Sequence, residues 1–123
     1  CDLKKQDIIY ENDYAFVSYD SYPVSKFHSL IIPKRHIKNF FDLNDKELYA
    51  CNELIKIIKS KIENDDNLVE GFNLGTNAGS VAGQTIMHCH IHLIPRRRGD
   101  VENPPGGVRG VIPLKQHYLR KSK

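Results

Sequence analysis

The stretch Gly83-Gln84-Thr85-Ile86-Met87-His88-Cys89-His90-Ile91-His92-Leu93-Ile94-Pro95 holds three of the chain's six histidines, at every second position. Side chains alternate between the two faces of a β-strand, so a strand here would gather the three imidazoles on one face. The opposite face would carry the apolar side chains of Met87, Cys89, Ile91 and Leu93. We therefore expect one face to serve chemistry and the other to join the core.

Three readings of the histidine cluster differ in what they predict. A buried imidazole needs a hydrogen-bond partner, and neighbouring imidazoles repel when protonated, so packing alone explains the cluster poorly. A cation clamp would use the same residues, but the stretch has no Asp or Glu nearby to complete it. A nucleophilic or acid–base site is the reading that the pattern favours.

Length and composition indicate one ordinary globular domain spanning residues 1–123, with 40% hydrophobic and 27% charged residues. No apolar run reaches membrane-spanning length and the charged start does not resemble a signal peptide, so we expect a cytoplasmic protein without a membrane partner. Cys1, Cys51 and Cys89 have no disulfide-framework spacing and are expected as reduced thiols. The net charge of +3 is too weak to indicate a nucleic-acid partner.

Four further segments are predicted to form strands of one sheet. Residues 8–10 and 14–19 form a predicted hairpin, residues 27–32 a strand stopped by Pro33, and residues 71–74 a fourth strand. Residues 99–123 are expected to form a C-terminal loop and tail, because 103–107 is rich in Pro and Gly. Within that tail, residues 108–112 have the composition of a further pairing strand.

One main helix should begin after Asn44. Asn44 has the residue type of an N-cap, and Glu47 stands three positions later, where its carboxylate can reach back to a free backbone N–H. The apolar residues that follow recur at helical spacing and predict one buried stripe, made of Leu48, Cys51, Leu54, Ile55, Ile58 and Ile62.

Two segments flank the histidine stretch with groups that suit an anion. Residues 75–83 are rich in glycine, and small residues let backbone N–H groups approach an oxyanion closely. Gln84 and Thr85 add neutral side-chain donors directly before the histidines. The basic run of residues 96–98 follows the stretch and is well placed to attract phosphate.

The His88–Leu93 stretch, with apolar residues between its histidines, resembles the signature of the histidine triad (HIT) family. Other blocks resemble the same family in the same order. Residues 27–36 are similar to its first conserved block and residues 83–85 to its phosphate loop. Asp20 and Asn77 fall at the spacings of its substrate-binding positions.

The resemblance implies an α+β fold, in which an antiparallel sheet of about five strands carries one packed helix and is extended by dimerisation into a homodimer. It also implies binding of a nucleotide, with an adenine nucleotide expected, and hydrolysis or transfer at the α-phosphate. A histidine at position 92, where the transferase branch has glutamine, favours hydrolysis. Residues 93–100 resemble dinucleoside polyphosphate hydrolases. The tail 103–110 resembles bacterial members, which usually have arginine where Pro105 stands.

The residue roles follow from phosphorus chemistry and from the resemblance together. A neutral imidazole is a suitable attacker on a phosphorus that carries negative oxygens, and His90 is the expected nucleophile, with its other ring nitrogen donating to a backbone carbonyl. His92, Gln84 and Thr85 are expected to hold the non-bridging oxygens. His28 and His88 are expected to form a supporting relay. By resemblance, Asp20 binds the ribose hydroxyls.

The chemistry requires no cofactor, although magnesium can assist with a polyphosphate substrate by neutralising its charge. By resemblance to bacterial relatives, Cys1, His36 and His88 form a candidate structural zinc site. Two other functions stay open at this point. One is a purine nucleoside phosphoramidase, and the other is a nucleotide-binding interaction protein with incidental activity.

Overall fold

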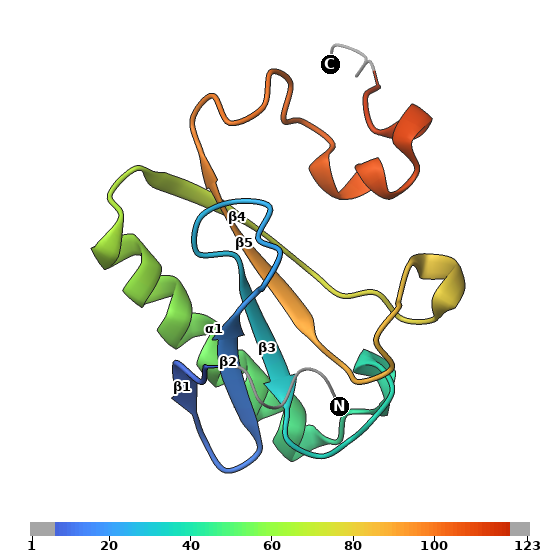
Figure 1. Ribbon diagram of the computed structural model, residues 1–123. Helices are drawn as coiled ribbons and strands as arrows, with labels where there is room; N and C mark the ends of the chain where they lie inside the picture. The colour runs from blue at the N-terminus through green and yellow to red at the C-terminus, as the bar shows by residue number, and fades with distance from the viewer. Residues whose placement is uncertain (1–6, 119–123) are drawn as a thin grey trace.

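The computed structural model describes residues 7–118 and forms an α+β fold with one antiparallel sheet, as predicted. The strands lie in the order β1-β2-β3-β5-β4, and helix α1 packs across one face (Figure 1). Their bounds are β1 Tyr10–Glu11, β2 Ala15–Tyr19, β3 Ser29–Pro33, α1 Asp45–Asp65, β4 Val69–Gly75 and β5 Ile91–Arg97. Residues 7–118 also contain four short 3-10 helices, namely η1 Phe40–Asp42, η2 Ser80–Ala82, η3 Gly107–Val111 and η4 Pro113–Lys115.

The register of the sheet fixes where the site can lie. His92 on β5 stands opposite Leu30 on β3 and opposite Gly75 at the end of β4. Leu30 in turn stands opposite Ser18 on β2. His92 is therefore held in the middle of the sheet, and the chain leaves β4 beside it to enter the glycine-rich loop.

Helix α1 begins as predicted, with a reciprocal cap. The Glu47 N–H donates to Asn44 Oδ1 at 2.9 Å, and the Asn44 N–H donates to Glu47 Oε1 at 3.0 Å. The stripe beyond the cap packs against the sheet through Cys51, Leu54, Ile58 and Ile62, which are at most 1% exposed. Within residues 7–118, no helix is both long and apolar enough to cross a membrane.

The predicted burial of Leu48 is wrong, because its side chain is 44% exposed. The neighbouring Glu47 takes the inward position at 2% exposure. Its carboxylate receives two hydrogen bonds of 2.8 Å from the Arg35 guanidinium. These bonds hold the pKa of Glu47 below its ordinary value, against the opposing effect of burial. The ion pair therefore fixes the rotation of the first helical turn and turns Leu48 outward.

The histidine stretch is only partly a strand. β5 begins at Ile91, so His88 and His90 precede it in irregular chain. The Cys89 N–H is taken by the Ile37 carbonyl, at 2.8 Å, in the loop after β3. Cys89, Ile91 and Leu93 are buried as predicted, but Met87 is 39% exposed.

The tail turns back beside the sheet without adding a strand to it. Residues predicted as a pairing segment form η3 instead, where the Arg109 N–H donates to the Gly106 carbonyl at 2.8 Å. Gly106 begins this turn with a φ of 81°, in the left-handed region that favours glycine. Figure 1 shows the tail as the orange-to-red segment that runs on from the end of β5.

We predict that Glu47→Ala lowers the free energy of unfolding by about 1–3 kcal/mol, because it removes the cap and two charge-assisted hydrogen bonds. Urea unfolding at pH 7 measures the change. The matched control is Glu63→Ala, which breaks an exposed 3.0 Å pair with Lys59 and should cost about 0.5 kcal/mol or less. Equal losses in the two variants would contradict a special role for Glu47.

The same variant gives a pH test with a defined sign. Because the pKa of Glu47 is lowered in the folded chain, its stabilisation is complete above the ordinary value of 4.5 and is lost as the pH falls below it. The stability difference between the wild type and Glu47→Ala should therefore shrink on acidification. A constant difference from pH 7 to pH 3 would contradict the ion pair as its source.

Candidate active site

His90 stands immediately before β5 with its ring fixed by the backbone. Its Nδ1 lies 2.8 Å from the carbonyl oxygen of His88, two residues earlier. A carbonyl only accepts, so Nδ1 carries the proton of the neutral ring and Nε2 keeps a lone pair. The predicted hydrogen bond from this ring to a backbone carbonyl is confirmed. The arrangement gives His90 the tautomer that a nucleophile needs.

His28 and His92 form a second chain of ring hydrogen bonds. The backbone N–H of Val24 donates to His28 Nδ1 at 3.1 Å, which places the ring proton of His28 on Nε2. His28 Nε2 lies 2.9 Å from His92 Nδ1 and therefore donates to it. His92 then carries its own proton on Nε2. The loop before β3 thus makes His92 a hydrogen-bond donor beside His90, whose ring centroid is 5.2 Å away.

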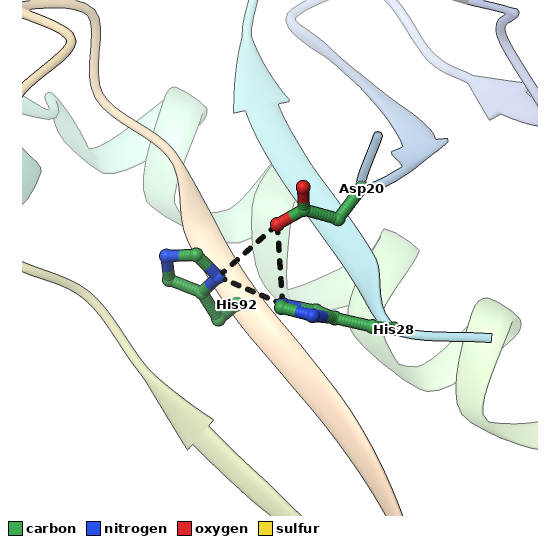
Figure 2. Close-up of side chains that lie close together, drawn as sticks. All are labelled: Asp20, His28 and His92. Carbon is green, nitrogen blue, oxygen red and sulfur yellow. Dashed lines mark hydrogen bonds and ion pairs between the residues drawn. The ribbon is translucent and has the colours of Figure 1, made fainter. Parts of the chain in front are cut away.

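Asp20 lies beside this pair of rings, as Figure 2 shows, at the end of β2. One carboxylate oxygen is 3.4 Å from His28 Nε2 and 3.9 Å from His92 Nδ1. The other accepts the N–H of Tyr22 at 2.9 Å. Burial lowers the pKa of both histidines, while Asp20 opposes that shift. Both imidazoles are consequently neutral at pH 7, where they can donate and accept in a fixed order.

Asp20, His28 and His92 also offer three ligand atoms within 4.8 Å of one another. A metal there would need the lone pair of His28 Nε2. The N–H of Val24 already occupies Nδ1, so Nε2 holds the ring proton. The hydrogen-bond pattern therefore favours a relay over a metal site at this place.

His88 belongs to a different pair from the one expected. Its Nδ1 is 3.3 Å from His36 Nδ1, and its Nε2 is 2.9 Å from the Pro33 carbonyl. The predicted relay between His28 and His88 is wrong, because each ring is bonded to another partner. His88 is 2% exposed, and burial lowers its pKa. Its contribution to His90 passes through its backbone carbonyl.

The His36–His88 pair fits two ligands of one zinc ion. Tetrahedral nitrogens bound at 2.0–2.1 Å lie roughly 3.3–3.4 Å apart, which matches the separation of the two Nδ1 atoms. The Pro33 carbonyl holds the second nitrogen of His88, an outer-shell bond typical of metal-bound histidine. The third expected ligand, Cys1, lies outside the described residues.

Gln84 braces the glycine-rich loop instead of pointing two free donors at a ligand. Its amide nitrogen donates to the carbonyls of Lys38, at 2.6 Å, and Ile86, at 3.0 Å. Its oxygen accepts the Gly79 N–H at 2.9 Å. The side chain is only 3% exposed, so its amide group is occupied by hydrogen bonds to the protein itself. The donor function expected of Gln84 is thus left to the neighbouring groups.

Two other residues of this loop that were expected at the ligand differ in exposure. Thr85 is exposed, and Asn77 is half-buried. The hydroxyl of Thr76, which the sequence analysis missed, donates to the His90 carbonyl at 2.7 Å and ties the loop to the segment that carries His90. A Thr directly after a strand carries no distinctive sequence signal, so only the fold reveals this contact.

The basic run is not a set of free cations. Each guanidinium is paired with a carboxylate: Arg96 with Asp100, Arg97 with Asp66 and Arg98 with Glu70. Arg96 also donates to Asn73 Oδ1 at 2.6 Å, and Arg97 donates to the Lys26 carbonyl at 3.0 Å. The expectation that this run attracts phosphate is not supported, because each of the three arginines already forms an ion pair with a carboxylate of this chain.

We predict that Gln84→Leu lowers the free energy of unfolding by about 1–3 kcal/mol, because two carbonyls and one N–H lose their partner. Thermal or urea unfolding measures it. Thr85→Val is the matched control from the same loop and should change stability by less than about 0.5 kcal/mol, since Thr85 is exposed. A neutral effect of Gln84→Leu would contradict the bracing role.

Known proteins are similar to this chain in sequence and fold. The HIT domain model matches residues 3–99. An uncharacterized HIT-like protein of Methanocaldococcus jannaschii is 40% identical over 96 residues, which cover 77% of this chain and 72% of that protein. The adenylylsulfatase HINT3 of Arabidopsis thaliana is 37% identical over 92 residues, covering 75% of this chain and 46% of its own length.

Two solved structures agree with the fold. A hypothetical histidine triad nucleotide-binding protein of Sulfolobus tokodaii has a TM-score of 0.70 at 35% identity, covering 76% of this chain, which spans 62% of that one. A zinc-bound histidine triad family protein of Mycobacterium smegmatis has a TM-score of 0.69 at 30% identity, with 76% and 67% covered. From the family model and these likenesses, the chain belongs to the HIT domain family.

Proposed function

We propose that this protein is a nucleotidyl hydrolase that acts at the α-phosphate of a nucleotide substrate through a covalent intermediate on His90. The observation that carries the proposal is the hydrogen bond from His90 Nδ1 to the His88 carbonyl, which leaves Nε2 with a free lone pair. The second ring chain supplies a donor at His92 beside it. The names of two relatives, an adenylylsulfatase and a nucleotide-binding protein, support the class of substrate.

The reaction proceeds in two balanced steps. In the first, the lone pair of His90 Nε2 attacks the α-phosphorus, a P–N bond forms, and the bond to the leaving group breaks with its electron pair. In the second, water attacks the phosphorus and gives up one proton to solvent, and the P–N bond breaks with its electron pair returning to Nε2. Nucleoside monophosphate is released, and His90 is again a neutral imidazole. His92 Nε2–H and the Thr85 hydroxyl donate to the non-bridging oxygens, worth about 3 kcal/mol for a good donor.

The nucleoside is assigned to the side of His92 where Asp20 lies. The Asp20 carboxylate accepts one N–H from Tyr22 and retains lone pairs for the ribose hydroxyls. Asn77 lies on the loop that follows β4 and is the second expected substrate contact. An adenine nucleotide is the substrate we would test first.

The finer substrate assignment has three candidates. The sequence likeness of residues 93–100 favours a dinucleoside polyphosphate, for which magnesium would neutralise charge. A nucleoside phosphoramidate is the alternative, and a nucleotide-binding interaction protein with incidental activity is the third. A panel of diadenosine polyphosphate, adenosine phosphoramidate and adenylyl sulfate, each with and without magnesium, separates the first two. Binding without turnover on every compound would favour the third.

We also propose a structural zinc ion held by His36, His88 and Cys1, with a fourth ligand to be identified. Its support is the 3.3 Å separation of the two Nδ1 atoms and the zinc-bound relative. Elemental analysis of the purified protein should give one zinc per chain, and the variant His36→Ala should lose it. A protein without stoichiometric zinc would contradict the site.

A homodimer is the expected assembly. β4 lies at the edge of the sheet, and its Leu74 is 50% exposed. An edge strand with free backbone groups is a template for pairing with a second copy. Sedimentation equilibrium tests the proposal, and a monomer at micromolar concentration would contradict it.

For the nucleophile, we predict that His90→Gly lowers kcat by a factor of roughly a thousand or more while nucleoside monophosphate still binds. Steady-state kinetics and calorimetry measure the two effects. Free imidazole added to His90→Gly should restore part of the turnover, because it can replace the missing lone pair. Wild-type turnover in His90→Gly without imidazole would remove His90 as the nucleophile.

A further inference from the structure

The turn that leads into His28 contains a strained residue. Phe27 has a φ of 71°, and within residues 7–118 it is the only residue other than glycine with a positive φ. In this left-handed region the Cβ atom crowds the following carbonyl oxygen, so a bulky aromatic residue rarely adopts it. Such a conformation persists only where the surrounding structure holds it. The contacts of Phe27 must therefore offset this strain.

The strained residue occupies the third position of a β-turn. The turn runs from Ser25 to His28, and the His28 N–H donates to the Ser25 carbonyl at 3.1 Å. A positive φ confined to the third position is the pattern of a type II turn, in which glycine is the usual residue there. Glycine would satisfy this backbone without strain. Phenylalanine stands there instead, so the benefit of Phe27 comes from its ring.

The Phe27 ring anchors the turn on the side of the sheet that α1 covers. It packs against the core cluster between α1 and the sheet, and its centroid lies 5.7 Å from that of the Tyr19 ring. The ammonium of Lys26 lies 5.1 Å from the Phe27 centroid. The Phe27 carbonyl accepts a 2.8 Å hydrogen bond from the hydroxyl of Ser29, which is 0% exposed. Both the ring and the carbonyl of the strained residue are thus held.

The first half of the turn is attached to β5, the strand that carries His92. The Ser25 hydroxyl donates to the Pro95 carbonyl at 2.8 Å. The Arg97 guanidinium donates to the Lys26 carbonyl at 3.0 Å. These two bonds set the position of the turn relative to the strand from which the His92 ring projects.

The closed turn decides which nitrogen of His28 carries the proton. The Val24 N–H, just before the turn, donates to His28 Nδ1, just after it, at 3.1 Å. The ring proton of His28 is therefore on Nε2, which donates to His92 Nδ1 at 2.9 Å (Figure 2). If the turn opened, His28 Nδ1 would lose its donor and could take the proton itself. The fixed direction of the hydrogen bonds toward His92 would then be lost.

We propose that Phe27 is a positioning residue, whose anchored ring keeps the turn closed and so gives His28 and His92 their Nε2–H tautomers. Phe27 packs toward α1 and acts on the site only through His28. Its effect on turnover rests on the proposed function, in which His92 Nε2–H donates to the substrate. Its effect on the tautomers does not, because they are set in the protein without substrate.

The test compares Phe27→Gly, which removes the ring and the strain, with Phe27→Tyr, which keeps the ring. Nitrogen NMR of the histidine rings, at a pH where they are neutral and without nucleotide, identifies the protonated nitrogen. We expect single Nε2–H tautomers at His28 and His92 in the wild type and in Phe27→Tyr, and mixed tautomers in Phe27→Gly. His90 should stay Nδ1–H in all three proteins, because the His88 carbonyl holds it.

The matched control is Phe72→Ala. Phe72 on β4 is also a partly buried ring of the same core cluster, and Lys59 Nζ lies 5.6 Å from its centroid. Phe72→Ala should lower Tm about as much as Phe27→Gly and leave every tautomer unchanged. Phe27→Leu keeps part of the packing and should give a smaller mixture, so it supplies the reading if Phe27→Gly does not fold.

The strain has its own measurement. Phe27→Ala and Phe27→Gly both remove the ring, but only alanine keeps the crowded Cβ atom at a positive φ. The Tm of Phe27→Ala should therefore lie below that of Phe27→Gly, by roughly 3–6 °C for a chain of this size. Equal Tm values would overturn the strained turn.

For turnover, kcat of Phe27→Gly should fall roughly threefold to tenfold with little change in KM, which is less than the loss of a whole donor. The substrate is the compound of the panel above that the wild type turns over fastest. Wild-type kcat together with mixed tautomers would overturn the effect of Phe27 on turnover.

The tautomers decide the proposal itself. Mixed tautomers in the wild type overturn it, as do wild-type tautomers in both Phe27→Gly and Phe27→Leu. An equal change in Phe72→Ala also overturns it. Mixed tautomers in Phe27→Gly alone, with no turnover of any compound by the wild type, would support the positioning role and contradict the proposed function.

Discussion

The site depends on one hydrogen bond, between the ring of His90 and the carbonyl of His88. The bond requires that the His88 carbonyl is not used in hydrogen bonds between strands, because such a carbonyl would point toward the neighbouring strand and away from the His90 ring. The chain meets the requirement by starting β5 only at Ile91. Cys89 donates to Ile37 in a loop, and the His90 carbonyl accepts from Thr76. Irregular backbone thus fixes the tautomer of His90.

Helix α1 and the sheet support the irregular segment that carries His88 and His90. α1 covers one face of the sheet with a fully buried stripe, which leaves the opposite face free for His92 and its neighbours. The ion pair between the buried Glu47 and the exposed Arg35 holds the start of the helix close to the loop that carries His36. Neutral imidazoles follow from burial, and neutral rings are what a directed sequence of hydrogen bonds needs.

Local patterns predicted the fold well because each element has a strong signal of its own. The Asn44 cap, the stripe from Cys51 to Ile62 and the strands around Ile31 all lie where the sequence indicates. The histidines were found for the same reason. Burial of Leu48 was predicted wrongly, because the spacing of apolar residues carries no information on the tertiary ion pair between Arg35 and Glu47.

Partners across the fold could not be predicted from the sequence. The pairing of His28 with His92 and of His88 with His36 depends on which loop reaches which ring. Gln84 was expected to donate to a ligand, yet its amide nitrogen donates to the backbone carbonyls of Lys38 and Ile86. The basic run had the right composition for phosphate, but acids at distant positions neutralise it. Such long-range satisfaction of polar groups decides which side chains remain for substrate.

The central claim is tested most directly by trapping the covalent species. The protein would be mixed with excess substrate, quenched within one turnover and digested, and the modified residue identified by mass spectrometry and by phosphorus NMR of the denatured adduct. The account predicts a nucleotidyl group bonded to Nε2 of His90 that forms and decays at rates consistent with kcat. An adduct on a different residue, or turnover with no adduct under conditions that preserve P–N bonds, would contradict it.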